Sequence, residues 1–416
     1  MRVYKFGGAS VKDADGVKNL AKVLQTTGYD NTLVVISAMG KTTNKMELVI
    51  KNYFENKEEL PSAIHEVIKY HNDILIELFP NKRHQVFEAI KVLFDELNAF
   101  FKSNKSPDYN YVYDQTIGYG ELISTTIISH YLNEIGLKNK WVDVREFIKT
   151  DNYYRRSNVN WEATQANISA NLDTNILNIT QGFLGSDANN FTTTLGREGS
   201  DYTAAIFAYC LNANSVTIWK DVPGVLNADP RYFENAQLLH QISYREAIEL
   251  AFYGASVIHP KTLQPLQRKE IPLYVKSFLN PEGAGTRVSK GKALEPEIPC
   301  FIVKKNQILI SLSSLDFSYI MEENISDIFS LLHLYKMKVD VIQNSAISFS
   351  VCIDNLYDNL EKLLQHLKAK FKVTCHEKVS LYTIRHYNES AIQELEKDKT
   401  LLLKQLTQVT VQIVTK

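Results

Sequence analysis

The amino-acid sequence predicts an α/β protein: a mainly parallel sheet sandwiched by helices, followed by two ferredoxin-like (βαββαβ) units, the second of them abbreviated. Three observations predict this fold. The chain opens with a strand–helix–strand pattern, the unit that builds parallel sheets. Two long segments with apolar residues three and four positions apart then indicate a helical hairpin. After Cys300, the order of the expected elements is βαββαβ, and a shorter version follows it.

The N-terminal two thirds of the chain is expected to hold the parallel sheet. Its opening unit comprises a strand over 2–6, a helix over 15–25 and a strand over 32–37. The hairpin covers 61–79 and 83–101. The other expected elements are a linking segment over 109–118, helices over 121–133, 200–211 and 244–253, and strands over 175–181, 215–219 and, last in this part, 271–275.

The C-terminal third is expected to begin after a linker. A Pro/Gly-rich turn at 280–286 and a polar stretch at 287–297 predict that linker. The first unit then has strands over 307–313, 339–343, 346–353 and 371–376 and helices over 325–336 and 356–370; the second has strands over 379–384 and 409–414 around a helix over 389–406. We therefore expect domains over 1–290, 299–378 and 379–416.

Composition argues against several classes of protein. The 416 residues carry a formal net charge of -1, and 22% are charged, which gives no support for binding nucleic acid or an acidic membrane. No apolar run of about 20 residues is present, so no membrane span is expected. The N-terminus lacks the pattern of a signal peptide. The four cysteines match no metal or redox spacing; Cys210 and Cys352 are expected to be core thiols, which suits a reducing cytoplasm.

The first motif with chemical meaning is KFGGAS over 5–10, between the first strand and the first helix. The glycines Gly7 and Gly8 let the backbone approach a ligand closely and present N–H groups to phosphate oxygens. Lys5 can neutralise phosphate charge. The pattern is not a P-loop, which needs GxxxxGK followed by Ser or Thr. A plain turn between strand and helix is the alternative interpretation.

A second motif surrounds Arg197. It reads TTTLGREGSD over 192–201 and precedes a helix that Ser200 or Asp201 can cap. A helix N-terminus favours an anion, and an arginine can grip a carboxylate through two parallel hydrogen bonds. The alternative is a capped turn with a solvated arginine. Three threonines and two glycines around one arginine favour a binding site.

Two further loops are candidates for ligand contacts. The stretch WKDVPGV over 219–225, with ADPR over 228–231, places a tight turn at the carboxyl end of a strand, where open α/β sheets bind ligands. The loop GASVIHPKT over 254–262 offers Lys261 to a nucleotide phosphate. A simple turn is the alternative for the first loop. His259, before a proline and beside apolar residues, is expected to be structural.

Two polar segments suit a small-molecule pocket. Glu121 stands at a helix start, where a carboxylate either interacts with the helix dipole or holds an ammonium group. The stretch SAMGKTTN over 37–44 follows an apolar strand and supplies small hydroxyls, among them Ser37 and Thr43. A polar turn is the alternative for that stretch.

The set and the order of these motifs closely resemble aspartate kinase, of the amino acid kinase superfamily. The family pattern KFGGTS, SAM…TN, GE.LS, TTLGRGGSD, DVPG…DPR and GA.V.HP.T is matched at 5–10, 37–44, 120–124, 193–201, 221–231 and 254–262. The resemblance covers 1–290, and the C-terminal units resemble ACT regulatory domains. The run TTLGR.GSD is specific, because it separates aspartate kinases from their carbamate, uridylate and acetylglutamate relatives.

The sequence departs from the family pattern at three positions and at its end. Ala9 replaces the usual threonine, Glu198 replaces a glycine beside the expected anion site, and Lys220 stands where many members carry threonine. The second ACT unit looks truncated, which puts the usual ACT–ACT dimer arrangement in question. Because the chain ends at Lys416, we expect the monofunctional form, without the homoserine dehydrogenase that some relatives carry.

The resemblance implies phosphoryl transfer from ATP to the side-chain carboxylate of L-aspartate, giving 4-phospho-L-aspartate, the first step toward lysine, threonine and methionine. Residues 1–180 would hold mainly the substrate and 181–290 the nucleotide. The implied catalytic cations are Lys5 and Lys261; the implied substrate contacts are Ser37, Thr43, Glu121, Arg197 and Asp201; the implied nucleotide contacts are Lys5, Gly7, Gly8, Ser10, Lys220, Asp221, Leu226, Arg231 and Lys261. Magnesium would arrive on the ATP oxygens, because the sequence has no dedicated ligand cage.

Two other functions remain open at this point. A related kinase of glutamate or acetylglutamate would also use Arg197, and one methylene changes binding by only about 1–3 kcal/mol. An inert ACT-type amino-acid sensor is the other, although the presence of Lys5, Arg197 and Lys261 argues against it. The family also implies a homodimer or higher homo-oligomer, and a lysine or threonine effector at the first ACT unit. There the loop over 318–324 lacks the family's glycine, whereas Asp340 and 344–345 match the opposite side of the pocket.

Overall fold

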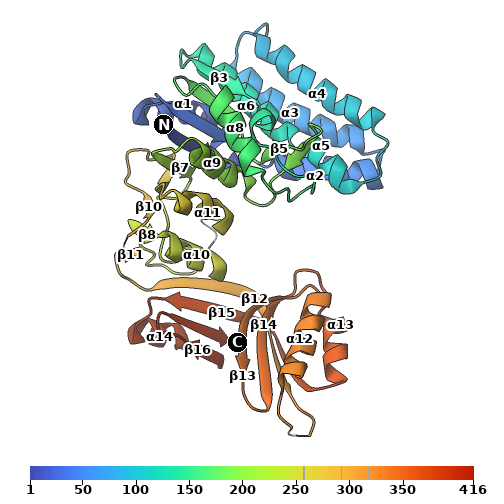
Figure 1. The fold of residues 1–416 in the computed structure, drawn as a ribbon, viewed down its shortest axis with the longest axis vertical. Helices are drawn as coiled ribbons and strands as arrows, with labels where there is room; N and C mark the ends of the chain where they lie inside the picture. The colour runs from blue at the N-terminus through green and yellow to red at the C-terminus, as the bar shows by residue number, and fades with distance from the viewer. Residues whose placement is uncertain (256–257, 292, 317) are drawn as a thin grey trace. The chain divides into compact units, whose positions relative to one another are not determined.

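The computed structural model describes residues 1–255, 258–291, 293–316 and 318–416, which form two compact units (Figure 1). The first unit comprises Met1–Val225, Leu238–Ile248 and Val257–Ala293; the second comprises Leu226–Gln237, Glu249–Ser256 and Leu294–Lys416. Two short segments from the middle of the chain therefore cluster with the C-terminal residues. Within the described ranges, none of the helices combines the length and the hydrophobicity that a membrane span requires.

A mainly parallel sheet forms the centre of the first unit. Its strands are β1 (Arg2–Phe6), β2 (Thr32–Ile36), β3 (Asn139–Val142), β4 (Leu177–Gln181), β7 (Ser215–Lys220), β8 (Gln241–Ser243), β9 (Leu273–Ser277) and β10 (Thr286–Ser289), in the order β8-β10-β9-β7-β1-β2-β4-β3. From β9 to β3 all neighbours are parallel, whereas β10 is antiparallel to β9. Strands β1, β2 and β4 are buried almost throughout, as parallel strands with both faces covered should be. The predicted α/β fold is confirmed.

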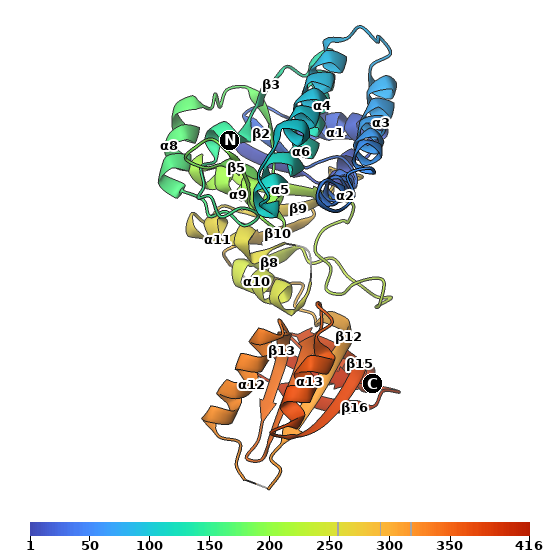
Figure 2. The same cartoon turned by 90° about the vertical axis from the view of Figure 1, so that its right-hand side faces the viewer.

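Helices cover both faces of this sheet (Figures 1 and 2). One core is shared by strand residues Tyr4, Phe6 and Trp219 and by α1 (Ala14–Thr27), α2 (Thr42–Glu55), α3 (Leu60–Leu78), α4 (Gln85–Ser103), α5 (Tyr109–Ile117) and α6 (Tyr119–Glu134). The predicted hairpin is α3 and α4. On the other face, α9 (Gly199–Cys210) packs on β1, β2 and β7, and α8 (Trp161–Asn171) and α11 (Pro260–Arg268) pack on α9. Because side chains alternate along a strand, Lys5 faces the α9 layer.

Two connections in the chain differ from the prediction. The segment expected to link helices over 109–118 is itself helical, α5, because the Asp108 side chain caps it by accepting from the N–H of Asn110. The expected polar linker over 287–297 includes most of β10 and all of β11 (Leu294–Glu295), while residue 292 lies outside the described residues. The prediction failed there because Arg287 is exposed between the buried Thr286 and Val288, so the strand is polar on one face.

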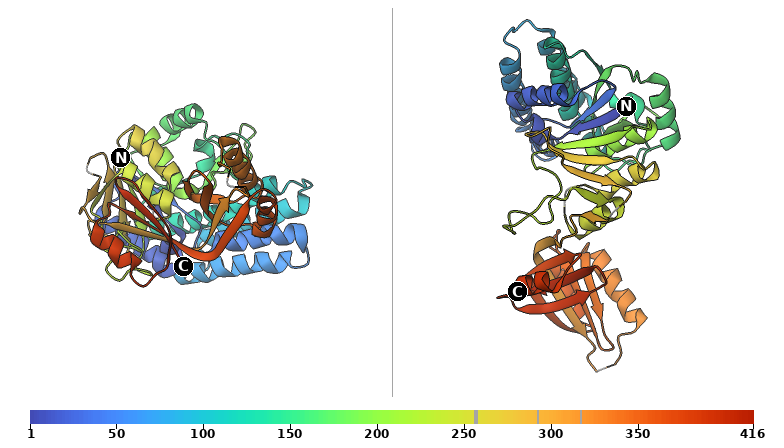
Figure 3. Two further views of the ribbon diagram at one scale, coloured as in Figure 1. Left: turned by 90° about the horizontal axis from the view of Figure 1, so that it is seen from below. Right: turned by 90° about the vertical axis from the view of Figure 1, so that its left-hand side faces the viewer.

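The second unit is built on two long antiparallel strands, β12 (Cys300–Ser313) and β15 (Lys372–Arg385), seen from two further sides in Figure 3. Its sheet has the order β13-β14-β12-β15-β17-β16, with β13 (Lys338–Asn344), β14 (Ser348–Asp354), β16 (Leu401–Leu406) and β17 (Thr410–Thr415). Helices α12 (Glu322–Leu334) and α13 (Leu360–Lys368) share a core with β12 and β14, and α14 (Glu389–Glu396) packs with β15 and β17.

The two ferredoxin-like halves share these long strands. The end of β12, Ile308–Ser313, pairs with β14, which pairs with β13. Its beginning, Cys300–Lys304, pairs with Leu381–Arg385 of β15. That part of β15 also pairs with β17, which pairs with β16. The abbreviated second half therefore takes its fourth strand from a segment about 80 residues earlier in the chain.

The helix predicted over 389–406 is wrong in its second part. Helix α14 ends at Glu396, a turn follows in which Asp398 has a φ of 59°, and Leu401–Leu406 form the edge strand β16. Leucine, lysine and glutamine are strong helix formers, which explains the prediction. The hydrogen bonds to β17 and the burial of Leu403 override that local preference.

The prediction for the cysteines is confirmed. Cys210 and Cys352 are both buried and free. Burial raises the pKa of the Cys210 thiol to about 11 and that of Cys352 to about 12. Both thiols are therefore neutral at physiological pH and act as small apolar core residues.

Candidate active site

A buried ion pair lies where the central strand of the first unit ends. The Lys5 Nζ atom of β1 is 2.6 Å from Oδ1 of Asp201, and both side chains are buried. Asp201 belongs to the first turn of α9, where a carboxylate also interacts favourably with the helix dipole. Because β1 is hydrogen-bonded to β2 and β7 on its two sides, the ammonium is held at the middle of the sheet's carboxyl edge.

The Gly7-Gly8 turn follows immediately and is closely packed. A Cβ atom added at Gly8 would lie 2.7 Å from the carbonyl oxygens of both Ala38 and Gly40, so only glycine fits there. The Gly40 N–H also donates to the Gly8 carbonyl at 3.0 Å. A Cβ atom added at Gly7 would lie 3.3 Å from Lys5 Nζ. Ser10, a predicted nucleotide contact, donates from its hydroxyl to the Gly7 carbonyl at 2.6 Å, and this hydrogen bond fixes the turn.

Glu121 is a buried carboxyl at the start of α6, with 3% of its surface exposed. Burial raises its pKa to about 8, although the backbone N–H groups of Ala38 and Glu121 and the charge of Lys5 act in the opposite direction. Its Oε2 atom has no hydrogen-bond partner among the residues that the structure describes. A buried carboxyl oxygen without a partner, close to a buried lysine, is well suited to receive a cationic group of a ligand.

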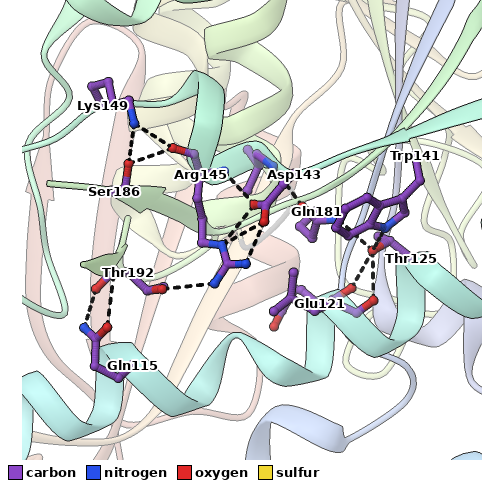
Figure 4. A network of polar contacts seen from close by, with 12 residues as sticks. Gln115, Glu121, Thr125, Trp141, Asp143, Arg145, Lys149, Gln181, Ser186 and Thr192 are labelled. Carbon is purple, nitrogen blue, oxygen red and sulfur yellow. Dashed lines mark hydrogen bonds and ion pairs between the residues drawn. The ribbon is translucent and has the colours of Figure 1, made fainter. Parts of the chain in front are cut away.

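Hydrogen bonds hold the start of α6 in place (Figure 4). The Thr125 hydroxyl accepts from Trp141 Nε1 at 2.9 Å and from Gln181 Nε2 at 2.8 Å, and donates to the Glu121 carbonyl at 2.9 Å. Ser124 donates from its hydroxyl to the Ser37 carbonyl at 2.9 Å, which joins α6 to the loop after β2. The predicted pocket residues on that side, Ser37 and Thr43, are half-buried.

The Arg197 loop, which we define as residues 195–198, connects β6 (Thr192–Thr194) to α9. β6 forms a hairpin with β5 (Leu184–Ser186). Gly196 and Glu198 have φ values of 80° and 54°, and the Arg197 side chain is exposed. Few residues other than glycine adopt such values. The family's glycine at the position of Glu198 thus corresponds to a left-handed backbone here.

Lys261 lies in the first turn of α11 and contacts the Arg197 loop. Its Nζ donates to the Leu195 carbonyl at 3.1 Å and lies 4.7 Å from the centre of the Tyr202 ring. Burial lowers the pKa of Lys261, while Asp151 acts in the opposite direction. His259 caps α11 by accepting from the Lys261 N–H at 3.1 Å, a structural role as predicted. Ser256 and Val257 of the same motif lie outside the described residues.

The predicted nucleotide contacts fall in both units. Lys220 ends β7 and Asp221 follows it in an exposed turn. Leu226 and Arg231 belong to the second unit, where the Phe301 N–H of β12 donates to the Asn227 carbonyl at 2.7 Å. Arg231 is exposed and forms an ion pair with Asp229 at 2.6 Å. Their part in nucleotide binding stays a prediction.

Sequence reasoning missed the residues that hold the site together. Thr125, Gln181 and Asp114 belong to none of the motifs, yet each hydrogen-bonds a segment that carries a predicted site residue. The local signal that could have identified Asp114 is weak: it is an acidic residue in a helix, α5, in which Val112 and Ile117 are also buried. Its partners lie 41 and 80 residues further along the chain, where no local pattern points to them.

The buried carboxyl of Glu121 should make stability depend on pH. Its pKa rises from 4.5 to about 8 on folding, so its contribution to stability is full below pH 4.5 and is lost as the pH rises through 8. We therefore expect Glu121→Gln to raise Tm relative to the unsubstituted chain at pH 9, but not at pH 5. Thermal denaturation at both pH values tests this. Glu66→Gln, at an exposed site on α3, is the control; an equal shift at both pH values would contradict the expectation.

Comparison with known proteins agrees with this geometry. Residues 1–277 match the model of the amino acid kinase family. The lysine-sensitive aspartokinase 3 of Escherichia coli (strain K12) is 32% identical over 400 residues, which cover 92% of this chain and 86% of that protein.

Two crystal structures of E. coli aspartokinase III are also similar to the chain. One, in complex with lysine and aspartate (T-state), has a TM-score of 0.84 at 28% identity and covers 100% of this chain and 95% of that one. The other, in complex with aspartate and ADP (R-state), has a TM-score of 0.79 at 28% identity and covers 100% and 96%. Fold, motifs and sequence identity agree, and the chain therefore belongs to the amino acid kinase family, and within it to the aspartokinases.

Proposed function

We propose that the chain transfers the γ-phosphoryl group of ATP to the side-chain carboxylate of L-aspartate, giving 4-phospho-L-aspartate and ADP. The observation that carries this proposal is the buried Lys5–Asp201 pair beside the Glu121 carboxyl, whose Oε2 atom has no hydrogen-bond partner among the described residues. It places a fixed cation and a carboxyl group with a free oxygen atom at one edge of the sheet. The E. coli relative, whose structure contains aspartate and ADP, supports the choice of substrates.

The chemistry requires cations rather than a base. The aspartate side chain has a pKa of about 3.9 and is already ionised at neutral pH. One of its oxygens attacks the γ-phosphorus, the bond from phosphorus to the β–γ bridging oxygen breaks, and ADP leaves with that electron pair. Two like charges about 4 Å apart repel by about 4 kcal/mol at an effective dielectric constant of 20. Positioning and charge stabilisation must therefore supply the catalysis.

Lys5 is the catalytic residue that this geometry favours. Asp201 holds its ammonium in one place at 2.6 Å, so little reorganisation is needed when negative charge moves between the oxygens of the phosphoryl group. The N–H groups of Gly7 and Gly8 would contact the same phosphate. Lys261 would bind a nucleotide phosphate. Within the described part of the chain, its Nζ atom would give up one hydrogen bond, to the Leu195 carbonyl, in exchange.

The amino-acid substrate would be bound by charges of opposite sign. Arg197 would clamp the α-carboxylate through two parallel hydrogen bonds. We assign the ammonium group to Glu121, because Asp201 Oδ1 already forms an ion pair with the Lys5 ammonium, whereas Glu121 Oε2 has no hydrogen-bond partner among the described residues. The protein would then release a proton on binding aspartate, since Glu121 is largely protonated below pH 8 before the ammonium arrives. Ser37 and Thr43 would line the same pocket.

The remaining nucleotide contacts are proposed from the motifs. Lys220, Asp221, Leu226 and Arg231 are the nucleotide contacts that the motifs imply, and Ser10 would support the phosphate turn through its hydrogen bond to Gly7. Mg²⁺ would bind through the phosphate oxygens, as it usually does in kinases, and would supply further charge neutralisation.

Regulation, assembly and location are also proposals. The E. coli relative is described as lysine-sensitive, which supports a lysine or threonine effector at the first ferredoxin-like half. Here Asp340, expected in that pocket, already pairs with Lys304 at 2.7 Å, so an effector's ammonium would compete with an internal one. We further propose a homodimer or higher homo-oligomer, and the cytoplasm as location, in keeping with free core thiols.

The proposed activity has a direct test. ATP and aspartate are incubated with the protein and hydroxylamine, which traps an acyl phosphate as a coloured hydroxamate. We expect signal with aspartate and none with glutamate or acetylglutamate. Signal with glutamate alone would change the substrate, and ATP binding without turnover of any of the three acids would favour an inert amino-acid sensor.

A further inference from the structure

A carboxylate outside the predicted motifs lies buried between α5 and the Arg197 loop. Asp114 of α5 has no exposed surface (0%). Its oxygens accept from the Arg155 N–H at 3.0 Å, the Thr194 N–H at 2.8 Å and the Thr194 hydroxyl at 2.9 Å. One side chain thus joins a helix, the loop around Arg155 and the strand β6.

Thr194 is the fixed point from which the Arg197 loop departs. Its carbonyl accepts from the Ser157 N–H at 3.0 Å, so both its N–H and its carbonyl are engaged. The next residue, Leu195, donates its N–H to the Phe183 carbonyl at 2.8 Å and offers its own carbonyl to Lys261. A displacement of Thr194 would therefore move both Arg197 and the acceptor of Lys261.

Backbone strain at Arg155 shows why this restraint is needed. Arg155 has a φ of 68°, a value that costs a non-glycine residue of order 1–3 kcal/mol and persists only where surroundings enforce it. Its carbonyl oxygen would lie 3.2 Å from a Cβ atom at Gly196, so its loop lies directly against the Arg197 loop. Its guanidinium lies 4.5 Å from the centre of the Tyr113 ring. Asp114 holds this strained turn through the Arg155 N–H.

We propose that Asp114 is a positioning residue for the amino-acid substrate, holding Thr194 and Arg155 so that the Arg197 loop keeps the conformation that presents Arg197. The proposal rests on the proposed role of Arg197. Without the carboxylate, the buried Thr194 N–H and the partly buried Arg155 N–H lose their acceptor, which is costly, and the loop relaxes to satisfy them elsewhere. Gln115 still holds the other end of β6 through two hydrogen bonds with Thr192, at 2.8 and 3.1 Å (Figure 4). The change is therefore confined to the loop.

The charge state of Asp114 sets the conditions of the test. Burial raises its pKa to about 6, while the hydrogen bonds from Arg155 and Thr194 and the charge of Arg155 act in the opposite direction. The other titratable groups facing it are Tyr113 of α5 and Tyr154 of the adjoining loop, both neutral near pH 8 because the pKa of each phenol is raised. At pH 8 the carboxylate is ionised, and variants are compared there.

The test compares Asp114→Ala with Asp114→Asn in the full chain. Alanine removes every acceptor, so we expect KM for aspartate to rise about 10-fold or more, and by a larger factor than KM for ATP. Asparagine keeps one oxygen for the N–H donors, and the Thr194 hydroxyl can turn to accept from its amide; KM should stay within about 3-fold of the unsubstituted value. A smaller folded fraction lowers kcat but not KM, so this readout separates positioning from stability.

Asp108→Ala is the matched control. Asp108 is an exposed carboxylate that caps the same helix, so its loss destabilises α5 without touching the Arg197 loop, and KM for aspartate should not change. An unchanged KM in Asp114→Ala, or an equal rise in Asp114→Asn, would overturn the proposal. If Asp114→Ala does not fold, Thr194→Val, which removes one of the bonds, should raise KM about 3-fold, and no rise would overturn it.

Titration calorimetry of aspartate without ATP separates this inference from the proposed activity. Tenfold weaker binding by Asp114→Ala supports it even if no variant turns over. If the unsubstituted chain does not bind aspartate, both the inference and the proposed function fail; if it binds aspartate and gives no hydroxamate, only the proposed function fails.

Discussion

Replacing Lys5 by alanine should lower kcat by about 10²-fold or more while changing KM for aspartate little. The ammonium is buried at the carboxyl edge of the central strand and fixed by Asp201. In the proposed mechanism it is therefore already in position when charge develops on the phosphoryl group. Alanine cannot supply that charge, and water in its place would have to reorganise during each turnover. Steady-state kinetics with saturating ATP and aspartate measure the effect; a near-normal kcat would remove Lys5 from the reaction.

The same substitution should also affect stability, and the two effects can be separated. Removing one partner of a buried pair leaves an uncompensated charge and costs about 3–5 kcal/mol. Asp201 would be that charge. We expect the double variant Lys5→Ala/Asp201→Asn to recover much of the lost Tm but none of the lost kcat. Lys22→Ala, at an exposed site on α1, is the control and should change neither quantity.

Replacing Arg197 by alanine should raise KM for aspartate by about 10²-fold, because a bidentate pair of charge-assisted hydrogen bonds to the α-carboxylate is lost. The side chain is exposed at the turn into α9, so Tm should stay unchanged. The effect on kcat should be smaller, since the α-carboxylate is remote from the reacting oxygen. Initial rates against aspartate concentration, at saturating ATP, provide the measurement.

Arg83→Ala, which removes an exposed arginine between α3 and α4, is the matched control for Arg197. It carries the same change of charge and should leave KM for aspartate as it is. If Arg197→Ala also left KM unchanged, the α-carboxylate would be bound elsewhere and the proposed arrangement of the substrate would be wrong.

The sequence predicted those features of the fold and site that depend on neighbouring residues. The apolar run of β1 and the two glycines after it lie within eight residues of each other, and the structure has them as a strand and a closely packed turn. The partner of Lys5 was not predictable in the same way. Asp201 lies 196 residues further along the chain, and only the packing of α9 on β1 brings the two together.

Local propensity also failed where one segment has two roles. The sequence predicts a strand over 307–313 only, whereas β12 already begins at Cys300. Its first residues, Cys300–Lys304, form a strand because they pair with Leu381–Arg385 of β15, far along the chain. In the same way, Leu401–Leu406 look helical alone and become a strand only because β17 offers an open edge. Glu198 is the opposite case: the family pattern marked the position, and the left-handed φ gives the physical reason for its usual glycine.

The shared strands β12 and β15 decide how the C-terminal unit comes apart. Their antiparallel pairing runs from Cys300–Arg385 at one end to Ser313–Lys372 at the other, interrupted only by register shifts near Gln307. Opening either ferredoxin-like half must break part of the ladder that stabilises the other. Truncation of the chain before Val379 would therefore remove Leu381–Arg385, the pairing partner of Cys300–Lys304, and would not leave an intact first half. We therefore expect the two halves to unfold as one cooperative unit, so that slow amide exchange extends across both.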